Sequence, residues 1–129
     1  MILSANTWYK QVQACHTIEI GRTRIARILS KDEQITMVNL LKSTASDAWI
    51  GAIRLAEGNF YWYDRRSQFE KEIEAQITLD SVVGTYWATG QPDNYLHQEN
   101  CVSLDRLNGW KWNDGGCGWM RRVVCETRC

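Results

Sequence analysis

Two stretches in the first half of the chain carry apolar residues at helical spacing, which predicts one helix over about residues 5–17 and a second over about residues 31–43. The second is preceded by a capping box, in which the Ser30 hydroxyl accepts from the Glu33 amide and the Glu33 side chain reaches back. The predicted apolar faces consist of Trp8, Val12 and Cys15 in the first helix and of Ile35, Val38 and Leu41 in the second. Both helices are therefore interpreted as scaffold.

The rest of the chain has the shorter apolar runs and turn signals of strands. Strands are predicted over residues 25–29, 48–53, 59–63, 102–104 and 120–125. The charged segment 70–74 fits either a short helix or a solvated loop, and the pattern does not decide between them. Residues 84–101 and 108–118 are rich in glycine and asparagine, which favours an irregular lobe. We expect one α+β domain over residues 1–129.

Composition excludes several classes of partner. The 129 residues are 44% hydrophobic, include seven tryptophans, and carry 15 basic and 15 acidic side chains that cancel. A neutral chain without a basic stripe does not indicate nucleic acid or an anionic membrane as a partner. No run of 18 apolar residues is present, so no segment is predicted to span a bilayer. The first residues lack the pattern of a secretory signal, which leads us to expect a processed form.

The cysteine count favours disulfides over a zinc site. The five cysteines have no C-x-x-C spacing and the chain has only two histidines, which disfavours structural zinc. They are Cys15, Cys101, Cys117, Cys125 and Cys129. Disulfides place the mature chain outside the cytosol, so we expect a secreted, extracellular protein. Four paired cysteines allow three connectivities, among which the spacing does not choose.

Oxygen-bearing side chains gather around and after Pro92, the only proline in the chain. They are Gln91, Asp93, Glu99, Asn113 and Asp114. Carboxylates and amides supply the hard oxygen ligands that calcium takes. A cis peptide is cheap only before proline, and it would aim both neighbours of Pro92 at one point. The pattern therefore indicates a calcium site.

Several short motifs follow one another along the chain. They are Trp49-Ile50-Gly51-Ala52, Trp62-Tyr63-Asp64, Trp87 ahead of Gly90-Gln91-Pro92-Asp93, Glu99-Asn100-Cys101-Val102, Trp112-Asn113-Asp114-Gly115-Gly116-Cys117 and Val123-Val124-Cys125-Glu126. In this order they resemble the C-type lectin domain family. The resemblance runs from Trp8 to Glu126 and fits the short form of the domain. It implies a double-loop α+β fold, in which two helices flank antiparallel sheets and a long irregular loop carries the ligand site.

The resemblance also implies the disulfide pairing, which is Cys15 with Cys125 and Cys101 with Cys117. Cys129 lies outside this set. An odd cysteine in a secreted chain favours a bridge to a second chain, and hence a homo- or hetero-dimer, with a free or capped thiol as the alternative. Two sugar sites on one rigid body would raise avidity for a surface that displays many sugars.

The family's sugar-binding calcium site implies five metal ligands here: Gln91, Asp93, Glu99, Asn113 and Asp114. The sugar itself would contact Gln91, Asp93, Tyr95, Glu99 and Asn113. A second, auxiliary calcium site of some members is weakened, because Asn94 and Asn100 stand where acids would be expected. The resemblance therefore implies Ca²⁺ as the cofactor, at one site.

Family members with Gln-Pro-Asp at this tripeptide generally favour galactose and N-acetylgalactosamine, whereas Glu-Pro-Asn generally favours mannose-type sugars. Two adjacent sugar hydroxyls would each donate to a carboxylate and accept from an amide, so exchanging the acid and the amide changes the preferred hydroxyl geometry. Tyr95 stands where galactose-binding members often carry an aromatic that packs on the apolar face of the sugar. We therefore expect a lectin for terminal galactose or N-acetylgalactosamine.

Other interpretations of these residues are weaker or lie in other classes. Asp93 and Glu99 could form the acid pair of a glycosidase. Both are expected to bind the metal instead, so we do not expect the protein to be an enzyme. His97 is interpreted as a solvated loop residue, and Trp110, Trp112 and Trp119 as core. The alternatives to a calcium-dependent lectin are a member of the fold that binds protein or ice, and a sugar-binding protein that reads the N-acetyl group without calcium.

Overall fold

The computed structural model describes residues 1–18, 22–28, 30–44, 46–54, 60–67, 70–77, 86–88, 90 and 100–127, with side chains omitted at 64–67 and 70–77. Within these residues the elements are β1 Ile2–Asn6, α1 Trp8–Ile18, β2 Thr23–Ile25, α2 Lys31–Leu41, β3 Ala48–Arg54, β4 Phe60–Ser67, β5 Glu70–Ile77, β6 Cys101–Asp105, the 3₁₀ turn Arg106–Asn108, β7 Lys111–Gly115 and β8 Arg121–Thr127. Neither described α-helix is long and apolar enough to cross a membrane. The predicted α+β class with two helices is confirmed.

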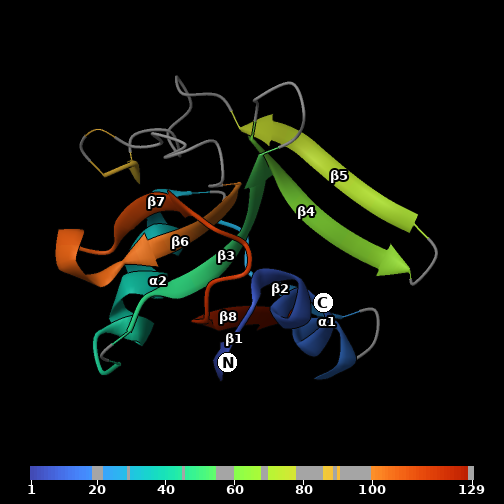
Figure 1. Ribbon diagram of the computed structural model, residues 1–129, viewed down its shortest axis with the longest axis horizontal. Coiled ribbons are helices and arrows are strands. Elements are labelled where there is room, and N and C mark those ends of the chain that lie inside the picture. Colours follow the sequence, from blue (N-terminus) through green and yellow to red (C-terminus); the bar gives the residue numbers. More distant parts are fainter. Residues whose placement is uncertain are drawn as a thin grey trace.

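The strands form a mixed sheet in the order β1-β8-β3-β4-β5, with β6 pairing both β3 and β7, and β2 pairing β8. The expected antiparallel pairing is wrong at one place, because β3 and β8 run parallel. Strand composition encodes burial and not the direction of a partner, so this pairing had no signal in the sequence. The β4–β5 hairpin projects to one side of the other strands (Figure 1).

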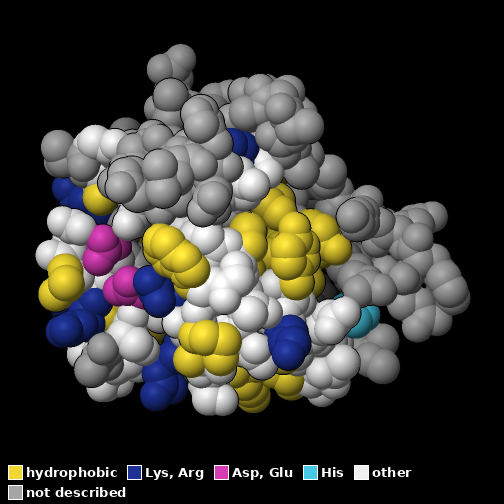
Figure 2. Space-filling view, viewed as in Figure 1, with side chains coloured by type: hydrophobic (Ala, Val, Ile, Leu, Met, Phe, Trp, Pro, Cys, Tyr) yellow, Lys and Arg dark blue, Asp and Glu magenta, His cyan; other side chains and the backbone are white. Residues whose placement is uncertain are grey.

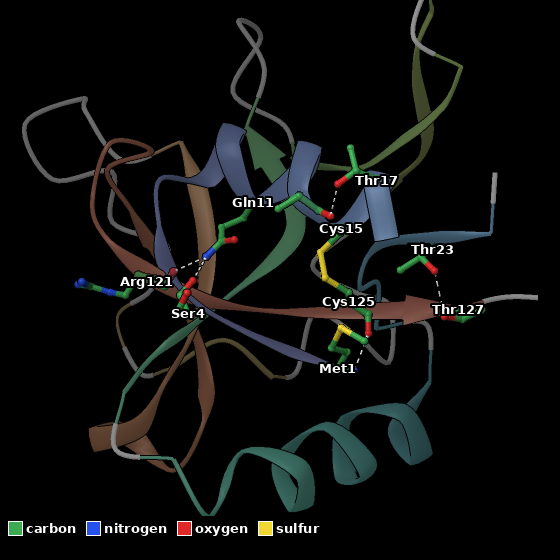
Figure 3. Close-up of a disulfide and its surroundings, with 10 residues drawn as sticks. Met1, Ser4, Gln11, Cys15, Thr17, Thr23, Arg121, Cys125 and Thr127 are labelled. Atoms are coloured by element: carbon green, nitrogen blue, oxygen red, sulfur yellow. Dashed lines mark hydrogen bonds between the residues drawn. A yellow bond between two sulfur atoms is a disulfide. The ribbon is translucent and has the colours of Figure 1, made fainter. Parts of the chain in front are cut away.

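The alternation of side chains along β3 separates the core into two parts, since successive residues of a strand point to opposite faces. Trp49 and Ile53 pack in one cluster with α1, whose predicted face of Trp8, Val12 and Cys15 is buried. Three residues on the opposite face of the strand pack in a second cluster with α2. They are Ala48, Ile50 and Ala52. The helices therefore cover opposite faces of the sheet, and Figure 3 shows α1 above β8 and α2 below it.

A covalent bridge and side-chain bonds to the main chain tie α1 to β8. Cys15 of α1 forms a disulfide with Cys125 of β8. Beside it the Gln11 amide donates to the carbonyls of Ser4 and Arg121, at 2.8 and 2.9 Å (Figure 3). The buried Gln11 thus satisfies backbone groups of two strands from one helix position.

The buried face of α2 is rotated by one residue from the predicted face. Ile35 is 49% exposed, whereas Gln34, Met37 and Leu41 are buried. A polar glutamine in the core has a physical reason, because both ends of its amide are hydrogen-bonded to the β6–β7 region. The predicted helix start is confirmed, since Ser30 accepts from the Glu33 amide at 3.1 Å.

Four segments differ from the predicted strands and loops. Segment 70–74 is neither helix nor loop, because it lies in β5, which pairs with β4. Part of the lobe predicted over 108–118 is a strand, because β7 pairs with β6 along its whole length. The strand predicted over 25–29 ends at Ile25, and the following Ala26 and Ile28 are buried outside it. The sequence pattern missed β1, which pairs with the carboxyl-terminal strand β8.

Trp119 is not the core residue that the sequence predicted, because it is 46% exposed. One face of its ring covers glycine backbone, and a Cβ added at Gly116 would lie 2.7 Å from the Trp119 Nε1. The Arg121 guanidinium lies 5.2 Å from the centre of the same ring. Trp110 and Trp112 are buried as predicted.

Candidate metal centre

Two of the five predicted calcium ligands stand side by side on β7. Asn113 is half-buried and Asp114 is 0% exposed. Their strand pairs antiparallel with β6, where Ser103 lies opposite Asn113 and Val102 lies opposite Asp114. The ladder fixes the backbone of both residues, so their positions do not depend on a bound ligand.

An aromatic cluster underlies this part of β7. Trp112, directly before Asn113, is fully buried. The rings of Trp62 and Trp87 pack edge-on against the Trp112 ring, each with a distance of 5.5 Å between ring centres. The Trp112 indole donates to the Gln34 carbonyl oxygen at 3.1 Å, while the Gln34 amide donates to the Trp110 carbonyl at 3.2 Å. Helix α2 therefore holds the start of β7 through one side chain.

The turn that leads into β7 has unusual backbone geometry. Gly109 and Trp110 have φ values of 68° and 63°, in the left-handed region. Glycine adopts this conformation readily, but a bulky residue does so at a cost. The Trp110 amide donates to the Asp105 carbonyl at 2.8 Å, and the bond from Gln34 holds the Trp110 carbonyl. Buried contacts thus maintain a strained residue two positions before Trp112.

Described residues on both sides of segment 91–99 are attached to β3, β6 or β7. The Ala88 amide donates to the Trp112 carbonyl at 2.8 Å. The Arg54 amide donates to the Asn100 carbonyl at 2.7 Å, and Cys101 lies opposite Gly115. The structure also forms the second disulfide that the resemblance implies, between Cys101 and Cys117. The chain therefore leaves for this segment, and returns from it, beside Asn113 and Asp114.

The other predicted site residues lie outside the described part of the chain. They are the ligands Gln91, Asp93 and Glu99, the sugar platform Tyr95, the neighbouring His97 and the odd cysteine Cys129. Among the residues that the structure does describe, no three acidic, histidine or cysteine side chains are grouped to hold a metal ion. The structure thus brings together Asn113 and Asp114, and the remainder of the ligand set stays a prediction.

Asp114 has a buried cationic partner that the sequence analysis missed. The Arg54 Nη2 donates to the Asp114 Oδ2 at 3.0 Å, and the two side chains are 9% and 0% exposed. A carboxylate has about four lone-pair sites on two oxygens, so one such bond does not exhaust its capacity. Carboxylate and amide oxygens are also the donors that calcium prefers. Asn113 and Asp114 therefore fit the ion in donor type, and Arg54 adds a positive charge at the same place.

The sequence analysis missed Arg54 and Gln34, because neither position carries a strong sequence signal. Arg54 ends an apolar strand, where an arginine is usually solvated, and Gln34 is a polar residue beside the more apolar Ile35. Pairing of β3 with β6, and of β6 with β7, brings Arg54 to Asp114. Packing of α2 against the sheet brings Gln34 to Trp112. Burial of both polar groups depends on partners distant in sequence.

Lysine and arginine side chains lie singly among hydrophobic and neutral ones over the described part of one face (Figure 2). They form no continuous stripe there.

Comparisons with known proteins place the chain among C-type lectins. The sequence model of the family described as Lectin C-type domain matches residues 4–127. C-type lectin 16 of Aedes aegypti is 38% identical over 100 residues, which is 74% of this chain and 56% of the relative. The alpha-N-acetylgalactosamine-specific lectin of Patiria pectinifera is 32% identical, over 84% of this chain and 60% of the relative. The chain thus spans little more than half the length of these relatives.

The fold is also found in solved structures. A C-type lectin from the tunicate Polyandrocarpa misakiensis superposes with a TM-score of 0.75, over 100% of this chain and 98% of that one. The two sequences are 20% identical. At this identity the likeness establishes the fold and leaves the ligand open.

Proposed function

Because the chain belongs to the C-type lectin domain family, we propose that it is a calcium-dependent lectin for terminal galactose or N-acetylgalactosamine on glycoconjugates. The observation that carries the proposal is the pair Asn113 and Asp114, held on β7 between the two attachment points of segment 91–99. The protein would bind the sugar without changing it chemically. A binding site needs only positioned donors and acceptors, and no nucleophile is required.

Five residues would hold the metal: Gln91, Asp93, Glu99, Asn113 and Asp114. Calcium bound there would accept two adjacent sugar hydroxyls into its shell of six to eight oxygens. The carboxylates of Asp93 and Glu99 would accept from those hydroxyls, and the amides of Gln91 and Asn113 would donate to them. Each hydroxyl would thus be fully hydrogen-bonded, which is how a polar ligand is selected over an analogue.

The order of amide and acid at Gln91 and Asp93 supports the galactose type. Their exchange would change which pair of hydroxyls satisfies all four hydrogen bonds. Tyr95 would pack on the apolar face of galactose, a contact worth about 1 kcal/mol. The starfish relative, whose name gives it as specific for alpha-N-acetylgalactosamine, agrees with this preference.

The proposal extends to location and assembly. Two disulfides in so small a chain are typical of an oxidising environment, and one relative is named a salivary C-type lectin. We therefore propose secretion, and a homo- or hetero-dimer that Cys129 could link. Non-reducing electrophoresis of the purified protein and of Cys129→Ser tests the bridge, which requires a dimer band that the variant lacks.

Binding to a surface coated with galactose-terminated glycoprotein tests the function. We expect binding in calcium, its loss in chelator, and inhibition by free galactose well before mannose. The double variant Gln91→Glu/Asp93→Asn should reverse the order of the two sugars, whereas the control Gln98→Glu, which changes an amide to an acid outside the predicted ligand set, should keep it. Binding that persists in chelator would contradict the metal site. Stronger inhibition by mannose in the unaltered chain would contradict the specificity.

A further inference from the structure

The ion pair between Arg54 and Asp114 is the starting point. Its nitrogen and oxygen are 3.0 Å apart, and both side chains are almost completely removed from solvent. The pair between Arg121 and Asp47 is different, with a distance of 3.6 Å and side chains that are 30% and 27% exposed. Water and salt screen the exposed pair, whereas a buried pair keeps most of its electrostatic interaction.

Arg54 is held in place by contacts on three sides. Its amide donates to the Asn100 carbonyl at 2.7 Å, which fixes the backbone. Its residue position pairs with Phe60 across the β3–β4 ladder, and the guanidinium lies 4.6 Å from the centre of the Phe60 ring. A guanidinium over an aromatic face gains a cation–π interaction in addition to its ion pair. The cation is therefore a fixed part of this site.

We propose that Arg54 is a resident cation that sets the calcium affinity of the site through Asp114. The inference rests on the proposed calcium site and names a residue that regulates it. Without metal, a fully buried carboxylate is costly unless an opposite charge accompanies it. Arg54 supplies that charge, so the metal-free chain keeps both its fold and the position of Asp114.

The same charge opposes the metal. A calcium ion that shares the Asp114 carboxylate with a guanidinium is repelled by it, and in a buried setting this repulsion is poorly screened. Removing the guanidinium would remove the repulsion and would also make the metal-free state less favourable. Both effects act in one direction, so a neutral residue at position 54 should bind calcium more tightly and depend on it more for stability.

Two variants at position 54 separate charge from shape. Arg54→Gln keeps a planar amide that can donate to Asp114 but has no charge, and Arg54→Lys keeps the charge. By calorimetric titration, Arg54→Gln should bind calcium about tenfold more tightly than the unaltered chain, since one unit charge beside a divalent ion is removed. Arg54→Lys should stay within about threefold. The rise in melting temperature on adding calcium should be larger for Arg54→Gln, and its melting temperature in chelator should be lower.

Each outcome decides the inference separately from the proposed function. Calcium affinity in Arg54→Gln equal to or weaker than that of the unaltered chain, which itself binds, overturns the inference and leaves the function standing. Calcium binding by Arg54→Gln alone supports the inference and contradicts the function, because Arg54 would then exclude the metal. No binding by either chain overturns both. If Arg54→Gln is unfolded in chelator, recovery of its fold in calcium supports the inference, and failure to recover overturns it.

Discussion

The junction between α1 and β8 and the junction between β3 and β7 are stabilised in different ways. At the α1–β8 junction a disulfide joins Cys15 and Cys125, and Gln11 bonds to main-chain carbonyls. At the β3–β7 junction a buried charge pair joins Arg54 and Asp114. If calcium binds as we propose, it competes with Arg54 at the second junction and leaves the first set of contacts unaltered. The comparison therefore predicts separate responses to calcium at the two junctions.

The largest expected effect comes from breaking the α1–β8 junction. The double variant Cys15→Ala/Cys125→Ala opens a bridge between residues 110 positions apart, and removing a disulfide that closes so long a loop should lower the free energy of unfolding by about 5 kcal/mol. Urea unfolding at 25 °C in chelator measures this loss. Calcium affinity, measured on the folded variant, should stay within about twofold, because the bridge joins α1 to β8 whereas the ion pair joins β3 to β7. A parallel fall in calcium affinity would show that the junctions are coupled.

Breaking the β3–β7 junction should lower the free energy of unfolding by a somewhat smaller amount. Asp114→Ala leaves the Arg54 charge buried without this carboxylate, which should destabilise the chain by about 3–5 kcal/mol and abolish calcium binding. Asp47→Ala is the matched control at the more exposed pair with Arg121, where about 0–1 kcal/mol is expected. Urea unfolding of both variants in chelator gives the difference. Equal losses would mean that burial of the Arg54 pair has no energetic consequence.

The smallest effect should come from breaking the two hydrogen bonds by which Gln34 joins α2 to Trp110 and Trp112. Gln34→Leu removes both bonds of the Gln34 amide and leaves the Trp112 indole and the Trp110 carbonyl unsatisfied, which should cost about 1–3 kcal/mol. Gln13→Leu, at an exposed position of α1, should change the stability by no more than about 0.5 kcal/mol. Thermal unfolding measures both. Calcium affinity should fall in Gln34→Leu, since Trp112 directly precedes Asn113; an unchanged affinity would exclude a positioning role for Gln34.

Local signals predicted features of the two helices better than they predicted the β3–β7 junction. The buried face of α1 and the cap at Ser30 depend on residues within two turns of helix, so spacing reveals them. Position 35 was assigned wrongly, because helical periodicity places the apolar Ile35 in the core and gives the polar Gln34 beside it no buried role. The buried indole of Trp112, far along the chain, reverses that order.

Segments whose stability comes from partners far along the chain could not be predicted. Residues 70–77 are rich in glutamate and lysine, which disfavour strands, yet pairing with β4 makes them β5. The glycine and asparagine residues of 108–118 indicate turns, but residues 111–115 form a strand because they pair with β6. Arg54 follows the same rule, since its role depends on Asp114, 60 positions away. The five calcium ligands were predicted from a motif order, which carries information that periodicity lacks.

Calorimetric titration of calcium into the purified, metal-free protein tests the central claim most directly. The account predicts saturable binding at one site per chain, with Asn113 and Asp114 among its ligands, and loss of that binding in Asp114→Ala. A titration without any heat of binding would contradict this account, if it extends to several millimolar calcium, where the weakest extracellular sites still bind.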